Sequence, residues 1–349
     1  MITEERLSAT MLWRPRDGDG RPAADRRARN PVVWFVVRRL LFAVLTIVVV
    51  SVVIFAATEL LPGNAAQAIL GQNATPTRIR QLEQTLHLNA SVTTQYWDWF
   101  SGLLTGHLGH SLVDSNTVAS LLSDRVVNSL TLVVLAGVIG TLIAVAAALY
   151  SALHRGGFFD EAIGLVTLAI AALPEFVIAI AIVILFATVV FHWLPAVSLI
   201  PPGQTALSHP TLLVLPVATL VLATMPYTFR MLRASAIEVL ESEYVAMARL
   251  KGLSQRRILL RHVIPNALPS TVQVVALAFS WLAGGVVLVE YVFNYPGIGQ
   301  AFVDAVNNRD VPVVQALAIL LAGFYVLMNL AADLSAVLLS ARTRSSLAR

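Results

Sequence analysis

The chain has 349 residues, of which 57% are hydrophobic and only 13% are charged, and its mean hydropathy is +0.76. Soluble domains average about 45–50% apolar and about 25% charged residues, so this composition excludes an ordinary soluble protein. The absence of cysteine excludes a disulfide framework, a thiolate metal site and a cysteine nucleophile.

The N-terminal part changes character near residue 32. Residues 1–31 are rich in Arg, Asp, Gly and Pro without apolar periodicity, so we expect a disordered cytoplasmic extension there. A first transmembrane helix is predicted over residues 32–61, and residues 62–125 form a sizeable external segment before the next apolar run.

Long apolar stretches make up most of the rest, and a membrane-spanning helix needs roughly 20 such residues. Uncharged runs of sufficient length cover 40–58, 126–153, 210–229, 263–289 and 311–332, and a further stretch, 162–190, is interrupted only by Glu175. The sequence therefore predicts an all-α integral membrane protein with six transmembrane helices. Residues 126–340 form the core with the second to sixth spans, and residues 341–349 form a cytoplasmic tail.

Basic residues sort to alternate loops. Short loops rich in Lys and Arg are retained in the cytoplasm. With the N-terminus inside, only Arg78, Arg80, Arg125 and Arg309 of the 24 basic residues fall on the outer side. This pattern places both termini in the cytoplasm, and it explains the net charge of +4 by topology rather than by a nucleic-acid partner.

The external segment carries a short helical pattern and then four aromatic residues, at Tyr96, Trp97, Trp99 and Phe100. Aromatic rings favour the headgroup level of a membrane, so an interfacial anchor is one interpretation. A docking surface for an external partner is the other.

The inner loop between the fourth and fifth spans, residues 234–265, is predicted to form two short helices. Apolar residues recur at helical spacing from Ile237 to Ala248, Gly252 is expected to end that helix, and a basic second segment is expected to stop at Pro265. A helix pair joined at a glycine suits insertion into a groove on another protein. The alternative is a helix that lies on the anionic inner leaflet through its arginines.

The stretch from Glu243 to Leu253, EYVAMARLKGL, is similar to the coupling motif of one family, the inner-membrane permease subunits of dipeptide, oligopeptide and nickel ABC importers. In this resemblance the three positions of the EAA motif hold Ala246, Met247 and Ala248. The residues it implies for coupling to an ATPase are Glu243, Tyr244, Ala246, Met247, Ala248, Lys251, Gly252 and Pro265.

Similarity to this family extends over about residues 34–340. The resembling residues outside the loop include Pro62 and Gly63 after the first span, Pro174 and Glu175 in the third, Glu290 at the end of the fifth, Pro296 and Gly297 in the loop that follows, and Asp310 before the sixth. The chain departs from the family pattern at Asn64 and His107, where Asp is usual, and at residues 340–342, where Asp-Pro-Arg is usual.

The resemblance implies the permease subunit of an ATP-driven importer in a bacterial inner membrane, which passes peptides or a related small solute from an external binding protein to the cytoplasm by alternating access. Such a subunit pairs with a second, related permease, and two ATPase subunits carry ATP and Mg. This chain is expected to bind no metal or cofactor and to be no enzyme. It has no Gly-x-x-x-x-Gly-Lys-Ser/Thr loop, and its only lysine is Lys251. Relatives carry dipeptides, longer peptides, nickel chelates, glutathione or haem, so the substrate stays open.

Two acidic residues, Glu175 and Glu290, fall within or beside predicted spans. An ionisable group at membrane depth is costly and therefore marks a functional hypothesis. Both are candidates for the translocation path or a gate, together with Pro174, which is expected to kink its helix. For Glu175 a structural or gating role is favoured over contact with solute. For Glu290 the alternative is a structural carboxylate bonded to loop backbone.

Three other classes of protein make different predictions. A secondary transporter or channel that works without ATP would predict repeat symmetry or discontinuous helices at matched positions, which the sequence does not display. A membrane-embedded enzyme would need a nucleophile and base, or paired acids, converging at membrane depth, and the sequence suggests no such group. A scaffold whose loop has lost its partners stays open.

Overall fold

The computed structural model describes residues 31–59, 75–78, 80, 90–114, 116–201 and 203–339. Within these ranges the regular structure is helical, apart from an isolated bridge between His110 and Thr117. The predicted cytoplasmic extension up to residue 30, the predicted tail and the external positions Pro62 and Gly63 lie outside the described residues.

Five helices in the described ranges are long and apolar enough to cross a membrane. They are α1 (Pro31–Glu59), α5 (Val118–Leu153), α8 (Pro210–Leu240), α11 (Ile264–Val292) and α13 (Val311–Leu339). The others that matter below are α4 (Val92–Leu104), α6 (Phe158–Ala171), α7 (Glu175–Val183), α9 (Glu243–Leu250), α10 (Gln255–Ile258) and α12 (Ile298–Asn307). The predicted all-α membrane fold is confirmed.

The predicted third span corresponds to a bent pair of apolar helices, which makes a sixth crossing if the pair is one span. Helices α6 and α7 are bent by 103° at the break between them, so the predicted third span is not one straight helix. Pro174 is the N-cap of α7, with extended backbone at φ −61° and ψ 148°. Its ring restricts the preceding residue, and it has no N–H to continue the ladder of α6. The expected kink at Pro174 is therefore a complete break.

The two ends of this broken helix lie at opposite ends of α8. Asp160 of α6 bonds Arg233 near the end of α8, whereas Ser198, after α7, bonds Leu212 in its first turn. The Ser198 N–H also donates to the carbonyl of Phe293 beyond α11, at 2.7 Å. The segment from α6 to Ser198 therefore contacts both ends of α8, as a broken sixth span would.

Helix α8 forms the centre of the bundle. Its buried Leu215 and Leu220 pack in one cluster with Leu132 of α5, Ile178 of α7 and Leu282 of α11. The central position of α8 therefore rests on apolar side chains that pack on α5, α7 and α11.

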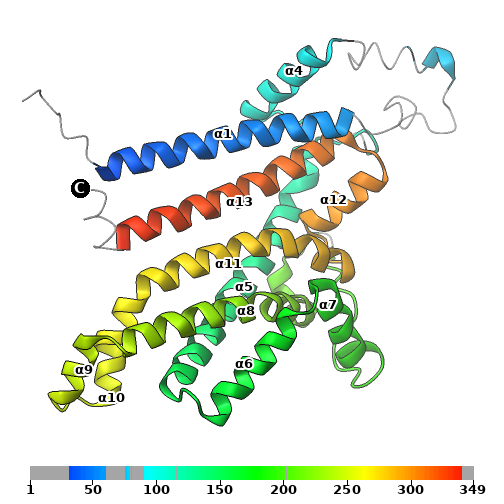
Figure 1. Cartoon of the computed structure of the whole chain (residues 1–349). Helices are drawn as coiled ribbons and strands as arrows, with labels where there is room; N and C mark the ends of the chain where they lie inside the picture. Colours follow the sequence, from blue (N-terminus) through cyan, green and yellow to red (C-terminus); the bar gives the residue numbers. More distant parts are fainter. Residues whose placement is uncertain are drawn as a thin grey trace, which may run out of the picture.

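Helix α1 lies at the edge and runs antiparallel to α13 (Figure 1). Arg39 pairs with Asp333 at 3.0 Å near one end, and the Gln315 amide donates to the Thr58 hydroxyl at 2.8 Å near the other. Most other side chains of α1 are exposed apolar groups, as expected for a lipid-facing helix.

The ends of the bundle differ in what they carry. Helices α9 and α10 lie at the same end as the first residues of α1 and the last of α13, and α4 and α12 lie toward the opposite end (Figure 1). The basic loop of α9 and α10 thus lies at the end where the charge pattern predicts both termini, the cytoplasmic side.

Candidate functional site: an exposed inner helix and a closed outer junction

The inner loop contains two helices, but their bounds differ from the prediction. The expected continuous helix from Ile237 to Ala248 is wrong, because α8 ends at Leu240 and α9 begins at Glu243. Ser242 separates them: its backbone is extended, and its carbonyl accepts the first hydrogen bonds of α9 at 3.1 Å. Serine is a favoured residue at the N-cap of a helix, and the apolar spacing used for the prediction does not detect this signal.

Helix α9 has one buried and one exposed face. Val245 and Ala248 are 0% and 5% exposed and pack on the end of α8. Tyr244, Met247 and Leu250 are 44%, 56% and 82% exposed. Three large apolar side chains in a row on a short polar helix form a surface that this chain leaves uncovered, which marks an interaction site.

Gly252 follows the end of α9, as predicted. Its N–H donates to the Arg249 carbonyl at 2.9 Å, and the Leu253 N–H donates to Ala248 at 3.3 Å. Its φ of +72° is a left-handed conformation that glycine adopts without strain. No heavy atom of a described residue lies within 4 Å of where a Cβ would stand, so this part of the chain leaves room there.

Pro265 does not stop the second segment, contrary to the expectation. Residues Gln255–Val292 form one helical run that includes α10, a π-helical turn at Leu259–Val263 and α11, and Pro265 lies in the first turn of α11. The wider hydrogen-bond spacing of a π turn interrupts the α-helical ladder there, so the missing N–H of proline is tolerated.

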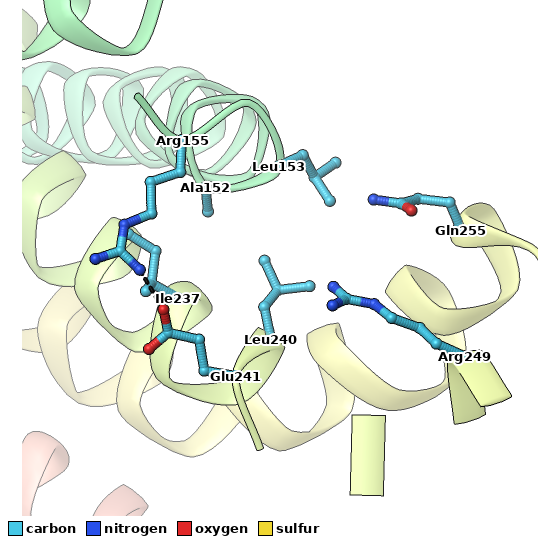
Figure 2. A pocket seen from close by; sticks show the side chains of 8 residues that line it. All are labelled: Ala152, Leu153, Arg155, Ile237, Leu240, Glu241, Arg249 and Gln255. Carbon is cyan, nitrogen blue, oxygen red and sulfur yellow. Dashed lines mark hydrogen bonds and ion pairs between the residues drawn. The ribbon is translucent and has the colours of Figure 1, made fainter. Parts of the chain in front are cut away.

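A cavity of about 150 Å³ lies beside α9, between the ends of α5 and α8 and the start of α10 (Figure 2). Its lining residues are Ala152, Leu153, Arg155, Ile237, Leu240, Glu241, Arg249 and Gln255. Arg155 and Glu241 form an ion pair on one side of it. The ion pair is exposed, so this space is a hollow at the surface beside α9, and α9 itself stays packed on α8 through Val245 and Ala248.

The outer ends of α5, α11 and α12 meet at Glu290, which is 0% exposed. Ser129 of α5 donates its hydroxyl proton to Oε1 of Glu290 at 2.5 Å, and the Gly299 N–H donates to Oε2 at 2.6 Å. The Ile298 N–H donates to the Ser129 oxygen at 2.8 Å. We call Ser129, Glu290 and the backbone of residues 297–299 the outer junction. Its closure favours the structural interpretation of Glu290 over contact with solute.

Further bonds link α5 to the loop after α11. The Tyr295 hydroxyl donates to the carbonyl of Asn128 at 2.8 Å, and the Asn128 side-chain amide donates to the Pro296 carbonyl at 2.9 Å. Burial, and to a lesser degree the Glu290 charge, raises the pKa of the Tyr295 phenol, so the hydroxyl keeps its proton. The sequence analysis missed Asn128 and Ser129, although two polar residues inside an apolar run were a signal.

Asp310 ties the external segment to the start of α13. Its carboxylate is 4% exposed and accepts a hydrogen bond from the Ser111 hydroxyl and another, at 3.1 Å, from the Leu112 N–H. The aromatic group of α4 lies against α1 instead, where the Tyr96 hydroxyl bonds Ser51 at 2.9 Å and its ring contacts Phe55. Both contacts hold external residues against the bundle.

Glu175 lies in a different environment. It is half-buried at the start of α7, beside the break, and makes no hydrogen bond or ion pair with another described residue. Its carboxylate lies against the backbone of Gly285 in α11, where a Cβ would come within 2.4 Å of Oε2. Glu175 and Pro174 therefore mark a contact between the broken crossing and α11, and Glu290 lies at the outer junction instead.

One face of α11 is open along its length. We call the exposed residues Gln273, Trp281, Gly284, Leu288 and Tyr291 the open stripe. Their spacing of three, four and eight places them on one side of the helix. Glycine and large apolar groups together on an exposed face suit close packing with another membrane helix.

Five membrane-length helices and a bent apolar pair, together with an exposed inner helix and an open helix face, define a multi-pass membrane subunit that is built to work with other chains. Residues 132–345 match the family model of the binding-protein-dependent transport system inner membrane component, and residues 32–133 match the model of its N-terminal part. The chain belongs to this family of ABC importer permeases, which are inner-membrane transport subunits.

Curated relatives cover nearly the whole chain. A probable peptide ABC transporter permease protein, y4tP of Sinorhizobium fredii, is 34% identical over 310 residues, which are 89% of this chain and 99% of the relative. The glutathione transport system permease protein GsiC of Escherichia coli is 33% identical in strain CFT073 and 32% in strain K12, over 86% of this chain and 95% of each relative. In this family ATP is hydrolysed in partner ATPase subunits, and a substrate-binding protein is the external partner.

Proposed function

We propose that this chain forms the translocation path of an ATP-driven importer for peptides or a small peptide-like solute such as glutathione, together with a second, related permease. The relatives support this substrate class, because they are a probable peptide permease and glutathione permeases at 32–34% identity. Two ATPase subunits bind ATP and Mg and hydrolyse the ATP. This chain supplies the membrane path and the element that receives the motion of the ATPase subunits.

The observation that carries the proposal is the exposed face of α9. Tyr244, Met247 and Leu250 extend from the predicted cytoplasmic end of the bundle while Val245 and Ala248 fix the helix to α8. A short helix held on one face and apolar on the other fits a groove in an ATPase subunit. In the alternative, the helix would lie on the inner leaflet, and its arginines and apolar side chains would contact lipid.

Gly252 adds a constraint on the same contact. No atom of a described residue lies near the position of a Cβ at Gly252. A side chain there would therefore contact the partner, and it would also strain the left-handed backbone. The remaining loop residues, Glu243, Ala246 and Lys251, are exposed beside it and complete the proposed contact surface.

The test measures ATP hydrolysis by the purified importer, with and without its binding protein, for the native chain and for Met247→Asp. We expect stimulation by the binding protein to fall about tenfold, which corresponds to the loss of an apolar anchor worth about 1.4 kcal/mol. Met247→Leu is the matched control and should keep most of the stimulation, since it conserves volume and polarity.

Undiminished stimulation in Met247→Asp would contradict the docking role of α9. Substrate uptake into vesicles without ATP would support the alternative, a secondary transporter or channel. Uptake that requires ATP and a peptide-loaded binding protein supports the importer and its substrate class together.

A further inference from the structure

A buried ion pair joins three helices at the inner end of the bundle. Arg233 of α8 donates to both carboxylate oxygens of Asp160 of α6, each at 2.7 Å. Ser151 of α5 bonds the same carboxylate and accepts from Nε of Arg233 at 3.0 Å. The Gly156 N–H donates to Asp160 at 2.9 Å. We call Ser151, Asp160 and Arg233 the inner clamp.

The inner clamp differs in kind from the other ion pair at this end. The side chains of Asp160 and Arg233 are 5% and 30% exposed and meet in a two-pronged geometry, which gives strength and direction. Arg155 and Glu241 are 57% and 63% exposed, and a pair in water contributes little. Ile163 of α6 also packs on Phe229 and Leu232 of α8, and the clamp adds a directional polar link to this apolar contact.

The clamp lies between α9 and the break in the third crossing. Arg233 is one turn before Ala236, which packs with Leu240 against the buried face of α9. On its other side, α6 leads from Asp160 to the 103° bend, and α7 begins there with Glu175 against α11. A displacement of α9 thus has a continuous path through α8, the clamp and α6 to the contact with α11.

We propose that the inner clamp is a positioning device that makes α6 move with α8, so that motion received by α9 changes the bend between α6 and α7. The inference rests on the proposed function, in which an ATPase displaces α9. The role of the clamp residues is to carry displacement, since a rigid link between packed elements transmits a change that a loose one would absorb.

The test measures substrate uptake and ATP hydrolysis in the same proteoliposomes, and its readout is the number of substrates imported per ATP. The variant is D160N/R233Q, which removes the ion pair but leaves no unpaired buried charge. We expect binding-protein-stimulated hydrolysis to persist while the ratio falls about fivefold or more, the lower end of typical couplings between sites. The matched control R155Q/E241Q removes the exposed pair and should keep the native ratio.

A covalent rescue separates transmission from simple stability. The chain has no cysteine, so D160C/R233C introduces the only two thiols in it. A short bis-methanethiosulfonate linker between them should restore the ratio, and the same reagent on D160C alone should not. A native ratio in D160N/R233Q, or uptake and hydrolysis that fall together at a constant ratio, would overturn the proposal. A native importer without binding-protein-stimulated hydrolysis would contradict the proposed function instead.

Discussion

Gly297 and Gly299 let the loop after α11 close over Glu290. A Cβ on Gly297 would lie 2.2 Å from Oε1 of Glu290, and one on Gly299 would lie 2.3 Å from the Cα of Val287. The second clash is the more severe, because a backbone atom inside α11 cannot move aside as a side chain can. The outer junction can therefore form only because the side chains of Gly297 and Gly299 are single hydrogen atoms and not methyl groups.

Gly299→Ala should lower the thermal stability of the purified importer, since overpacking of a close contact costs about 1–3 kcal/mol. The control is Gly323→Ala in α13, also a helical glycine, where a Cβ would meet nothing within 4 Å. That substitution should leave the melting temperature unchanged or raise it slightly, because Ala favours a helix over Gly. Equal melting temperatures for both variants would contradict the packing argument.

At the scale of elements, the carboxylates Glu290 and Glu175 have opposite surroundings. Glu290 accepts from Ser129 and from the loop backbone, so it connects α11 with α5 and α12. Glu175 has no such bond with a described residue and lies against α11 at the bend. The first carboxylate holds elements together, and the second lies where two of them can shift.

Substitution by glutamine should separate these roles. Glu290→Gln replaces one acceptor oxygen by an NH₂ group among donors, so we expect stability to fall by about 1–3 kcal/mol. Glu175→Gln removes no hydrogen bond and should leave the melting temperature near native while it slows uptake. Thermal unfolding of both variants, with uptake assays, checks this contrast. A similar loss of stability in Glu175→Gln would assign it a structural role.

At the scale of the whole molecule, the open stripe of α11 is a long exposed face on a helix whose other faces pack inside the bundle. Trp281 is 67% exposed, whereas the neighbouring Leu282 is 1% exposed inside the bundle. The two residues therefore face opposite surroundings from adjacent positions. If the importer contains two related permeases, the open stripe is where their path-forming helices should meet or line a common space.

Single cysteines test this arrangement without interference from native thiols of the chain. Trp281→Cys should cross-link to a cysteine placed at the equivalent position of the second permease, or react with a thiol reagent in the transport path. Leu282→Cys is the control and should do neither in the folded importer. Reaction at both positions to the same extent would contradict the exposure of the stripe.

Local features of the sequence were sufficient to predict the membrane fold, the loops that carry the basic residues, and the end of α9 at Gly252. Span length and apolarity are properties of consecutive residues, and the left-handed turn at Gly252 depends on one residue alone. Ser242, which divides α8 from α9, was also visible locally, but the apolar spacing across it concealed the boundary.

The sequence by itself determined that the chain is an all-α, multi-pass membrane protein and which family it belongs to, and its charge pattern predicts which loops face the cytoplasm. Only the tertiary structure decided that Glu290 is enclosed, that Asp160 meets Arg233, and that the third crossing bends by 103°. The physical reason is the separation along the chain of the residues that interact. Hydrophobic length and charge act along neighbouring residues, whereas a carboxylate finds its donors across helices that lie far apart in the chain.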